Sequence, residues 1–522
     1  MREIDESGGT QDGQINEQKS NKKHKTDLRS ASAQILATLI QDWLLLGIGL
    51  TLGVPTLVVG ALYRNPASTF TLDDDQASWI GSIPFICNII GSLASGPFQE
   101  QFGRKGSMIL VNIPFFCAWL LLFYARSVDT LYAASAIMGL CAGFSEAPLH
   151  SYCGEIGEPH LRGMLSTMST SAAIMGSLLI YVFAYFFEWR GAALISSAFP
   201  VITFISMTQI PESPTWLVMR GRLEDAQRSL CWLRGWVEPD QVRDEFEALV
   251  NYTKHKVASR ETDHLNILER PAIEKCNIFT AHLKGLTAKN LLLPLRMECI
   301  VIANSYTTGF AGSKPYQIQI FRQLGYGDFA KRILILGHLI FFVGAMGNLI
   351  LLPYFGKRKL ALFAFGLSIS CLFGIGTFGI FRMELIQIPG LFWLPLILIL
   401  VFKFTLGLSI MPLPWQLLCE VFPPIGRGTA SGISSAFGNL INFGMTKSFL
   451  YLKAWFDLPG VIYLYVACAF LGWLYFYFYL PETEGKTLEQ IESYFPKIMI
   501  ERKNFPSANQ DEKLSSKHSK AV

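Results

Sequence analysis

Long apolar segments alternate with short polar ones along most of this chain. Many of the apolar segments approach the length of about 20 residues that an α-helix needs to cross a bilayer. The expected fold class is therefore an all-α membrane protein. The pattern predicts twelve spans, at about 34–60, 77–98, 106–125, 130–153, 164–186, 190–210, 291–312, 330–352, 359–381, 392–418, 429–451 and 459–480.

A polar stretch divides the predicted spans into two sets of six. From it we expect five regions: an N-terminal tail (1–33), a six-helix bundle (34–210), a helical linker (211–290), a second six-helix bundle (291–480) and a C-terminal tail (481–522). An even number of spans places both tails and the linker on one side of the membrane. Outside the linker, that side carries about twice as many Lys and Arg residues as the other, which predicts that it is cytoplasmic.

Composition narrows the class of protein further. Of the 522 residues, 51% are hydrophobic and only 16% are charged, whereas soluble chains carry about 25% charged residues. This excludes a cytosolic enzyme, a secreted disulfide scaffold and a disordered chain. The formal net charge of +4 is too small to indicate a nucleic-acid partner.

No motif in the sequence predicts an enzyme. The cysteines are scattered singly, and the histidines form neither an HExxH motif nor a close cluster. We therefore expect no catalytic residue, no metal site and no cofactor. The first 33 residues are polar, so we expect no cleavable signal peptide, and the first apolar segment would itself direct insertion.

Three short motifs occur once in each set of six, at the same end of the corresponding span. They are Gly103-Arg104-Lys105 with Gly356-Lys357-Arg358, the Glu155/Arg162 pair with the Glu420/Arg427 pair, and Pro211-Glu212-Ser213 with Pro481-Glu482-Thr483. Three repeats in register indicate a duplicated chain. Such a duplication is typical of transporters in which two bundles rock around a site near the middle of the membrane.

The charged residues of these motifs are candidate gating residues. Carboxylate–guanidinium pairs can hold two bundles together where they are desolvated, and they contribute little once water enters the gap. On this basis we expect a gating role for Arg104, Glu155, Arg162, Glu212, Glu420, Arg427 and Glu482. The alternative is that these charges only set the topology and do not contact one another.

The motifs also identify a family resemblance that covers about residues 34–495. The chain resembles the sugar-porter branch of the major facilitator superfamily and, within it, the insect facilitated trehalose transporters. The resemblance rests on SWIGS (78–82), GRK (103–105), GEIGEPHLRG (154–163), IPESPTWL (210–217), PLPWQLLCEVFPPIGRG (412–428) and PETEGKTLEQIE (481–492). It implies twelve helices, a cytoplasmic helical insert and facilitated movement of a sugar.

The residues that bind sugar in this family are only partly present here. The family's seventh span carries a Gln-Gln pair, and the matching segment begins with Ser305 and Tyr306. The glutamine of the fifth span is replaced by Thr170. A glutamine amide offers a donor and an acceptor together, which Ser and Tyr replace only in part. The resemblance leaves Trp415, as a stacking face for a sugar ring, and Asn442.

Two further departures concern proton coupling. Proton-coupled members of this family place an Asp in the first span and an Arg early in the fourth. The matching positions here are Gly49 and Ser135. A proton carrier needs a titratable group whose pKa changes between states, so the sequence predicts uniport.

Among the ionisable residues that fall inside predicted spans are Glu146, His150 and Lys403, and Arg296 with Glu298 at the start of the seventh span. A charge at membrane depth is a functional-site hypothesis by default, so we include Glu146 and His150, four residues apart, in the candidate solute site. The alternative is that Glu146 and His150 satisfy each other and that Lys403 snorkels or pairs with Glu146.

Three functions remain open at this point. The first is facilitative transport of a hexose or a trehalose-like sugar in the plasma membrane. The second is transport of a charged organic solute, and the third is a solute sensor that does not transport. In each case we expect a monomer whose partners are the small solute and the lipid bilayer, with no nucleic acid.

Overall fold

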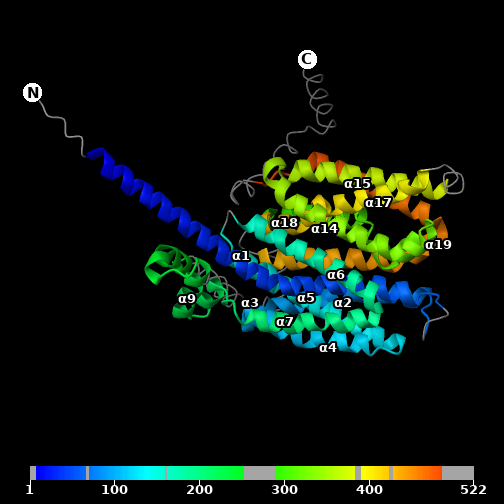
Figure 1. Ribbon diagram of the computed structural model, residues 1–522, viewed down its shortest axis with the longest axis horizontal. Helices are drawn as coiled ribbons and strands as arrows, with labels where there is room; N and C mark the ends of the chain where they lie inside the picture. Colours follow the sequence, from blue (N-terminus) through cyan, green and yellow to red (C-terminus); the bar gives the residue numbers. More distant parts are fainter. Residues whose placement is uncertain are drawn as a thin grey trace, which may run out of the picture.

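The computed structural model describes residues 8–65, 70–158, 161–251, 289–381, 390–422 and 427–484. Within these ranges, the side chains at 8–27, 97, 162, 289–291, 328, 419, 427–429 and 431 lie outside the description. Long helices that run roughly parallel to one another form the body of the molecule (Figure 1).

The first half of the sequence forms seven helices before the linker. They are α1 (Gly8–Leu62), α2 (Asp74–Phe102), α3 (Arg104–Leu110), α4 (Asn112–Phe123), α5 (Val128–Ile156), α6 (Arg162–Ser196) and α7 (Ala198–Met207). Within this half, α2 packs on α5 and α1 packs on α6. The linker begins with the short helices α8 (Pro214–Met219) and α9 (Leu223–Leu233) and the 3-10 turn η1 (Pro239–Val242).

The second half is more broken. Its helices are α12 (Lys289–Thr308), α13 (Gln317–Gln323), α14 (Ala330–Phe355), α15 (Lys357–Ile380), α17 (Leu394–Thr405), α18 (Pro412–Glu420) and α19 (Arg427–Tyr479). Between them lie the 3-10 turns η3 (Ala311–Tyr316), η4 (Gly327–Phe329) and η5 (Leu391–Trp393), and the π-helical turn η6 (Leu406–Ile410). The two halves meet where α2 packs on α19 and α6 packs on α14.

The spans agree with the twelve predicted from the sequence. In the described part of the chain, nine segments are long and apolar enough to cross a membrane. Two of them, Gly163–Met207 and Gly432–Tyr479, have 45 and 48 residues, which is enough for two crossings each. With α12, which corresponds to the predicted span at 291–312, this gives twelve crossings.

The turns inside the two double crossings have the same structure. Each is made by an acidic residue with positive φ, Glu188 (φ 55°) and Asp457 (φ 55°), in place of the glycine that such a conformation favours. A glycine follows three residues later, and a Cβ on either one, Gly191 or Gly460, would lie within 3 Å of the preceding phenylalanine. The sequence Phe-acid-x-x-Gly is thus a fourth repeated motif, which sequence reasoning missed.

Helix α1 extends further than expected. The sequence predicted a polar tail as far as residue 33, whereas one helix runs from Gly8 to Leu62, and its apolar part begins at Leu28. The polar segment has no proline and is rich in Lys and Gln, which favour helix. Polarity therefore marked where the predicted span begins, but it did not mark where the helix begins.

Two ends of the bundle are distinguished below. The α9 end is the one where α2 ends, at Gly103, and where α8 and α9 lie, on the left of Figure 1. The far end is the one where α2 begins, at Asp74, and where α19 turns at Asp457.

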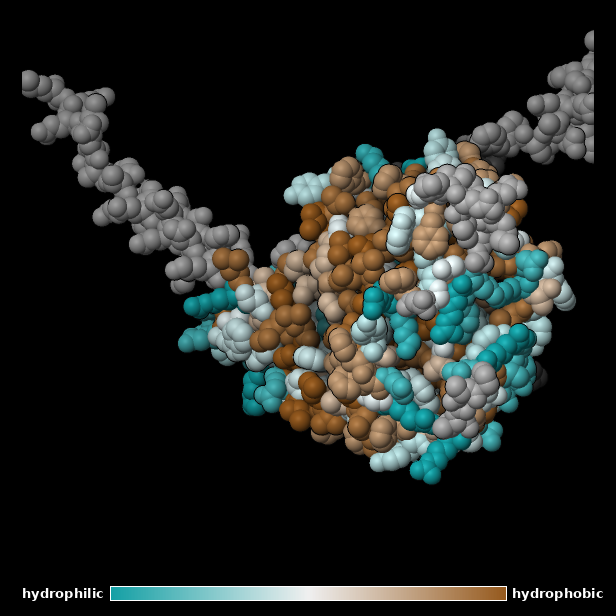
Figure 2. Space-filling model, turned by 45° about the vertical axis from the view of Figure 1, so that its right-hand side comes forward, coloured by the Kyte–Doolittle hydropathy of each residue, from teal (hydrophilic) through white to brown (hydrophobic). Residues whose placement is uncertain are grey.

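The flanks of the helices are apolar. In Figure 2 the brown side chains spread over the flank of the bundle, and the teal ones gather toward the end that is turned to the viewer. Leu93, Ile350, Phe363 and Leu471 are all more than 60% exposed. Exposed apolar side chains in such numbers fit a surface that faces lipid rather than water.

Candidate functional site

Glu146 lies at the centre of a polar cluster that both halves of the sequence build. Its carboxyl group accepts hydrogen bonds from Asn88 Nδ2 at 3.1 Å and Ser92 Oγ at 2.9 Å, both on α2. Ser435 Oγ, on α19, donates to the same carboxyl group. A single side chain on α5 therefore connects an element of the first half with an element of the second.

His150, one turn further along α5, contacts a different partner. Its ring stacks on the indole of Trp415, with ring centroids 5.4 Å apart and planes 11° from parallel. The described contacts include no hydrogen bond between His150 and Glu146, so the expectation that these two satisfy each other is wrong. This stack joins α5 to α18 and is a second contact between the halves.

Gln416, next to Trp415, fixes the position of α18. Its Nε2 donates to Thr167 Oγ1 on α6 at 3.2 Å and to Asn348 Oδ1 on α14 at 2.9 Å. Asn348 in turn donates to the carbonyl oxygen of Leu408, in the π-helical turn, at 2.6 Å. Trp415 thus lies on a short helix that the next residue, Gln416, anchors to both halves.

Two of the predicted sugar contacts are buried polar atoms that have no hydrogen-bond partner among the described residues. They are Ser305 Oγ on α12 and Asn442 Oδ1 on α19. Nearby, the ring of Tyr306 lies 3.2 Å from where a Cβ on Gly438 would be. Gly438 and Asn442 are four residues apart and share a face of α19. Buried polar groups are normally paired, so these atoms are available to a hydroxyl-bearing ligand.

Thr170 is less clearly part of the site. Its hydroxyl donates to the carbonyl oxygen of Ser166 in its own helix, at 3.1 Å. The structure therefore brings together Glu146 with α19, His150 with Trp415 and Tyr306 with α19, and no described contact joins Thr170 to any of them.

The two halves are sealed against each other at the far end. Lys447 Nζ lies 2.7 Å from Asp75 Oδ1, and Gly60 and Gly81 approach Ile318 and Pro315 so closely that a Cβ on either would lie within 3 Å of them. Three side chains also bond to backbone carbonyl oxygens across the boundary: Thr56 to Lys314 at 2.8 Å, Ser78 to Lys447 at 3.0 Å and Gln319 to Val59 at 3.1 Å.

At the α9 end, the repeated motifs fold into a compact ionic network in the first half. Gly103 has φ +87°, and a Cβ there would lie 2.3 Å from Glu212. The Glu212 carboxyl group accepts the backbone N–H groups of Arg104 and Lys105 at 3.1 Å, an arrangement that helix N-termini favour. The Arg104 guanidinium group lies 2.8 Å from Glu155. Burial raises the pKa of Glu212, although the bonded N–H groups oppose this rise.

The second half repeats this arrangement. Gly356 has φ +74°, and Glu482 accepts the backbone N–H groups of Lys357 at 2.9 Å and Arg358 at 3.0 Å. The buried Lys357 ammonium group lies 2.5 Å from Glu420. Lys357 thus occupies the position of Arg104, although sequence reasoning had not selected it as a gating residue. The repeated position after the motif glycine was the signal that could have found it.

The network differs from the prediction in one respect. We expected carboxylate–guanidinium pairs between the two bundles, whereas the ionic contacts described at this end, such as Arg104 with Glu155 and Lys357 with Glu420, lie within one half. Arg162 and Arg427 are the first residues of α6 and α19, and their side chains lie outside the described part of the structure. The gating role of the set therefore stays a prediction.

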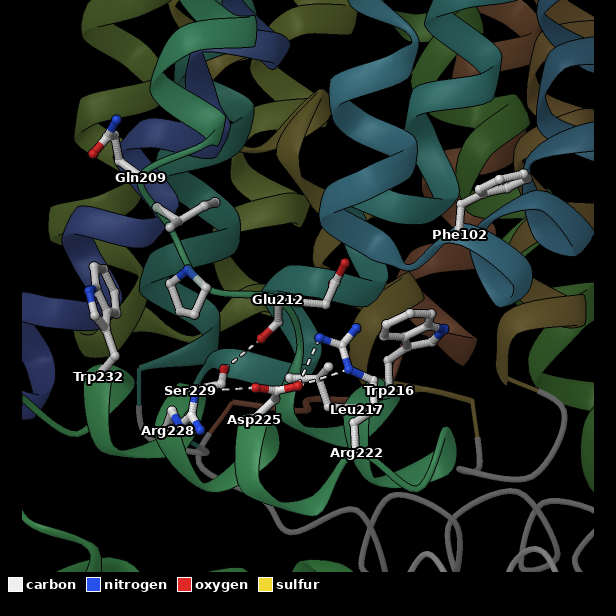
Figure 3. A pocket seen from close by; sticks show the side chains of 12 residues that line it. Phe102, Gln209, Glu212, Trp216, Leu217, Arg222, Asp225, Arg228, Ser229 and Trp232 are labelled. Atoms are coloured by element: carbon white, nitrogen blue, oxygen red, sulfur yellow. Dashed lines mark hydrogen bonds and ion pairs between the residues drawn. The ribbon is translucent and has the colours of Figure 1, made fainter.

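A pocket of about 460 Å³ lies beside the first network (Figure 3). Phe102, Trp216 and Trp232 contribute aromatic walls, and Glu212 lies at its inner side. Ser229 Oγ on α9 donates to the carbonyl oxygen of Glu212 at 2.5 Å. The pocket is lined by α8, α9 and the end of α2, so it marks the attachment of the linker to the motif of the first half.

Lys403 does not belong to the Glu146 cluster. It is buried on α17, and its Nζ donates to Gln317 Oε1 on α13 at 3.3 Å. The expectation that Lys403 pairs with Glu146 is therefore wrong. Depth along a helix placed the two residues at similar levels, but it carries no information on which face of the bundle each one occupies.

Comparison with known families identifies the class of protein. Residues 19–495 match the family described as "Sugar (and other) transporter". The chain belongs to this family of the major facilitator superfamily, and it is therefore a multi-pass membrane transporter and not an enzyme.

Among individual relatives, the chain is 27% identical over 462 residues to the "Facilitated trehalose transporter Tret1" of Polypedilum vanderplanki, covering 87% of this chain and 88% of that protein. It is 28% identical over 462 residues to the protein of the same name from Apis mellifera ligustica, covering 88% of each. It spans only about half the length of several Drosophila relatives, such as 49% of the D. virilis protein.

Solved structures show the same fold. The proton:xylose symporter XylE bound to 6-bromo-6-deoxy-D-glucose superposes with a TM-score of 0.72 at 22% identity, covering 89% of this chain and all of the other. XylE from E. coli in a partially occluded inward-open conformation gives a TM-score of 0.67 at 20% identity, covering 87% of this chain and all of that one. The all-α major facilitator fold expected from the sequence is confirmed.

Proposed function

We propose that this protein moves a neutral sugar, a hexose or a trehalose-like disaccharide, by alternating access between two six-helix halves, residues 34–210 and 291–480. The proposal rests mainly on one observation. Polar groups of both halves meet around Glu146 and Trp415, while the far end is sealed by contacts between the halves. A central site closed from one side is what an alternating-access cycle requires.

The chemistry of the central residues supports a sugar. Trp415 offers an aromatic face, and Ser305 and Asn442 hold buried oxygen atoms that no other described group pairs with. A sugar has apolar C–H faces and a rim of hydroxyl groups, which can both donate to and accept from such atoms. Binding would satisfy groups that are now unpaired, which is a favourable exchange.

The first span supports uniport. Helices α1 and α6 approach so closely at Gly49 that a Cβ there would lie 2.0 Å from the carbonyl oxygen of Ala173. An aspartate at this position would need the two helices to separate. Ser135, at the other family position, is buried and uncharged. The pair of ionisable groups that coupling in this family requires is therefore absent from these two positions.

We further propose that the α9 end is cytoplasmic and that the protein lies in the plasma membrane as a monomer. The excess of Lys and Arg on the side of the termini supports this orientation. The sealed far end would then face outward, and the described conformation would be closed toward the outside.

The test is uptake into liposomes that contain the purified full-length protein. We expect saturable uptake of labelled glucose or trehalose above that of empty liposomes, with a rate unchanged when a proton ionophore collapses an imposed pH gradient. Sugar binding without flux would favour the sensor. If the protein neither binds nor transports a sugar, the sugar proposal is rejected. A transport rate that depends on the pH gradient would reject uniport.

A charged organic solute is the second candidate, and Glu146 is the observation that favours it. Its carboxyl group lies in the cluster that joins the halves and could hold a cationic group. Under this alternative, Glu146→Gln would change the preference for charged over neutral solutes in the same uptake assay. Under the sugar proposal, it would lower sugar uptake without such a change.

A further inference from the structure

Three basic side chains from three elements converge near the boundary of the two halves, apart from the Glu146 cluster. They are Lys314 on η3, His338 on α14 and Lys403 on α17. The Nζ of Lys403 donates to Gln317, three residues after Lys314, which brings the two lysines into the same region, and both act electrostatically on the His338 ring. The aliphatic chain of Lys403 passes within 4 Å of the Cβ position of Gly337, beside His338.

Six of the elements around these residues carry no acidic residue. The sequences of η3, α13, α14, α15, α17 and η6 contain no Asp or Glu. The helices α1 and α6 also pack near this region. Of the described acidic side chains on α1 and α6, Asp42 accepts a hydrogen bond from Ser169, and Glu188 is exposed at a turn. The helices α12 and α19 also pack on η3. They carry Glu298, which is buried and has no hydrogen-bond partner among the described residues, and Asp457, which is exposed at a turn. No carboxylate among the described residues pairs with Lys314 or Lys403.

The polar contacts that these groups do make are too weak to balance the charge. Lys403 is 6% exposed, and its ammonium group has one hydrogen bond, of 3.3 Å, to a neutral amide. A buried ammonium group without a counter-charge is costly, and a second one nearby adds repulsion. Nδ1 of His338 lies 2.9 Å from the carbonyl oxygen of Leu334 and must donate to it, so Nε2 can donate to an anion only when the ring is protonated.

We propose that Lys314 and Lys403, with His338 beside them, bind a single anionic group: either a chloride ion or the carboxylate of an organic solute. Each ammonium group would supply a charged donor, which is the strongest type of hydrogen bond available to an anion. The bound charge would remove both the desolvation cost and the repulsion between the two lysines.

The position of this site links it to the seal at the far end. Thr56, on α1, donates to the carbonyl oxygen of Lys314 at 2.8 Å and lies 3.4 Å from the hydroxyl group of Tyr181, on α6. The Tyr181 ring contacts the His338 ring, with centroids 4.5 Å apart. An anion held by Lys314 and Lys403 would therefore stabilise the closed far end, because one of its ligands lies on the segment that contacts the first half.

The experiment measures binding and does not depend on transport. Purified full-length protein in nanodiscs is titrated at constant ionic strength, made up with the bulky anion isethionate, while its melting temperature is recorded. The three ligands are sodium chloride, sodium gluconate and glucose. Gluconate carries a carboxylate group, which glucose lacks. We expect a saturable rise in melting temperature with chloride or gluconate. A response to chloride alone identifies an inorganic ion, and a response to gluconate identifies the carboxylate of a solute.

Three variants and a control complete the test. We expect Lys403→Gln and Lys314→Gln each to weaken the apparent affinity for the anion at least about tenfold, whereas Lys331→Gln, at an exposed lysine of α14, leaves it unchanged. No saturable response to either anion in the wild type would overturn the proposal, as would an equal response in all the variants. Higher stability of Lys403→Met in the absence of any anion effect would overturn it too, because the ammonium group would then only destabilise the fold and would hold no anion. Failure of sugar uptake leaves these outcomes unaffected.

Discussion

The ammonium group of Lys447, on α19, lies 2.7 Å from the carboxylate of Asp75, in the first turn of α2, and 4.1 Å from the ring centroid of Trp79. The Tyr451 hydroxyl group donates to the same carboxylate at 3.2 Å. This ion pair joins residues 372 positions apart and connects the two halves at the far end. It must break if the halves separate there.

We therefore expect Asp75→Asn to favour opening of the far end. The pair is partly exposed, so its contribution is limited to about 1 kcal/mol, or a shift of up to about fivefold. A cysteine introduced at Ile318, which packs against Gly60, should react with a membrane-impermeant maleimide faster by up to that factor. Asp74→Asn is the control, because Asp74 pairs with Arg64 within the first half. Equal rates in the two variants would show that the Asp75 pair does not hold the far end closed.

The sequence predicted the spans and the duplication because both depend on local patterns. Hydrophobic length located the twelve crossings, and the repeated glycine–basic motifs located the networks at Glu212 and Glu482. The turns at Glu188 and Asp457 were missed, because an acidic residue with positive φ has no strong local signal. Lys357 was missed because the choice of gating residues considered arginine and not the repeated position.

Partners in the central site could not be predicted. Glu146 was selected as an ionisable residue at membrane depth, but its partner Ser435 lies 289 positions away, on a helix of the other half. Spacing along one helix shows which residues share a face, as for Glu146 and His150, but not which neighbouring helix lies opposite that face. The same limit explains why the alternative for Lys403 named snorkelling or a pair with Glu146, and not the contact with Gln317.

The contact between Glu146 and Ser435 should be measurable as a coupling energy. We expect Glu146→Gln and Ser435→Ala to be non-additive in the free energy of unfolding, by about 0.5–3 kcal/mol, as is usual for residues in direct contact. Each single variant should also lower sugar uptake, because the contact joins the halves.

Melting of the four proteins of this double-mutant cycle in nanodiscs is the measurement. Ser434→Ala is a matched control, because Ser434 is a buried serine on the same helix whose hydroxyl group has no partner in the described part of the structure. Additive effects of Glu146→Gln and Ser435→Ala would contradict the contact.

Trp415 should contribute to sugar affinity through its aromatic face. Loss of an aromatic stacking contact costs about 0.5–1.5 kcal/mol, so we expect Trp415→Ala to raise the half-saturation concentration for sugar by about two- to tenfold. Trp415→Phe should retain most of the affinity. Saturation curves in liposomes measure the effect, with Trp455→Ala, at a tryptophan that is 77% exposed, as the control. An unchanged half-saturation in Trp415→Ala would exclude Trp415 from the site.

Glu212 should make stability depend on pH. Burial raises its pKa above the ordinary 4.5 in the folded protein. An acid of this kind contributes stability that is fully present below its ordinary pKa and is lost as the pH rises through the folded pKa. The melting temperature of the wild type should therefore fall, relative to that of Glu212→Gln, as the pH rises from about 4.5 toward neutrality.

The difference between those two melting curves is the quantity to follow, since other groups titrate in both proteins. Glu224→Gln, at an exposed residue of α9, serves as the control and should show no such pH-dependent difference from the wild type. If the melting temperature of the wild type instead rises relative to that of Glu212→Gln as the pH rises, the N–H bonds to Glu212 outweigh the effect of burial on its pKa.

Close packing of α2 on α5 should depend on Gly143. A Cβ at this position would lie 2.0 Å from the carbonyl oxygen of Asn88, a residue whose side chain also donates a hydrogen bond to Glu146. Gly143→Ala must push the two helices apart, at a cost of about 1–3 kcal/mol, and should reduce both the melting temperature and sugar uptake. For Gly154, on the same helix, no described atom apart from its chain neighbours and its own helix backbone lies within 4 Å of the Cβ position. Gly154→Ala should therefore keep or slightly raise the melting temperature, because alanine favours helix by about 1 kcal/mol. Equal destabilisation by the two substitutions would mean that contact between α2 and α5 is not the reason for the glycine at 143.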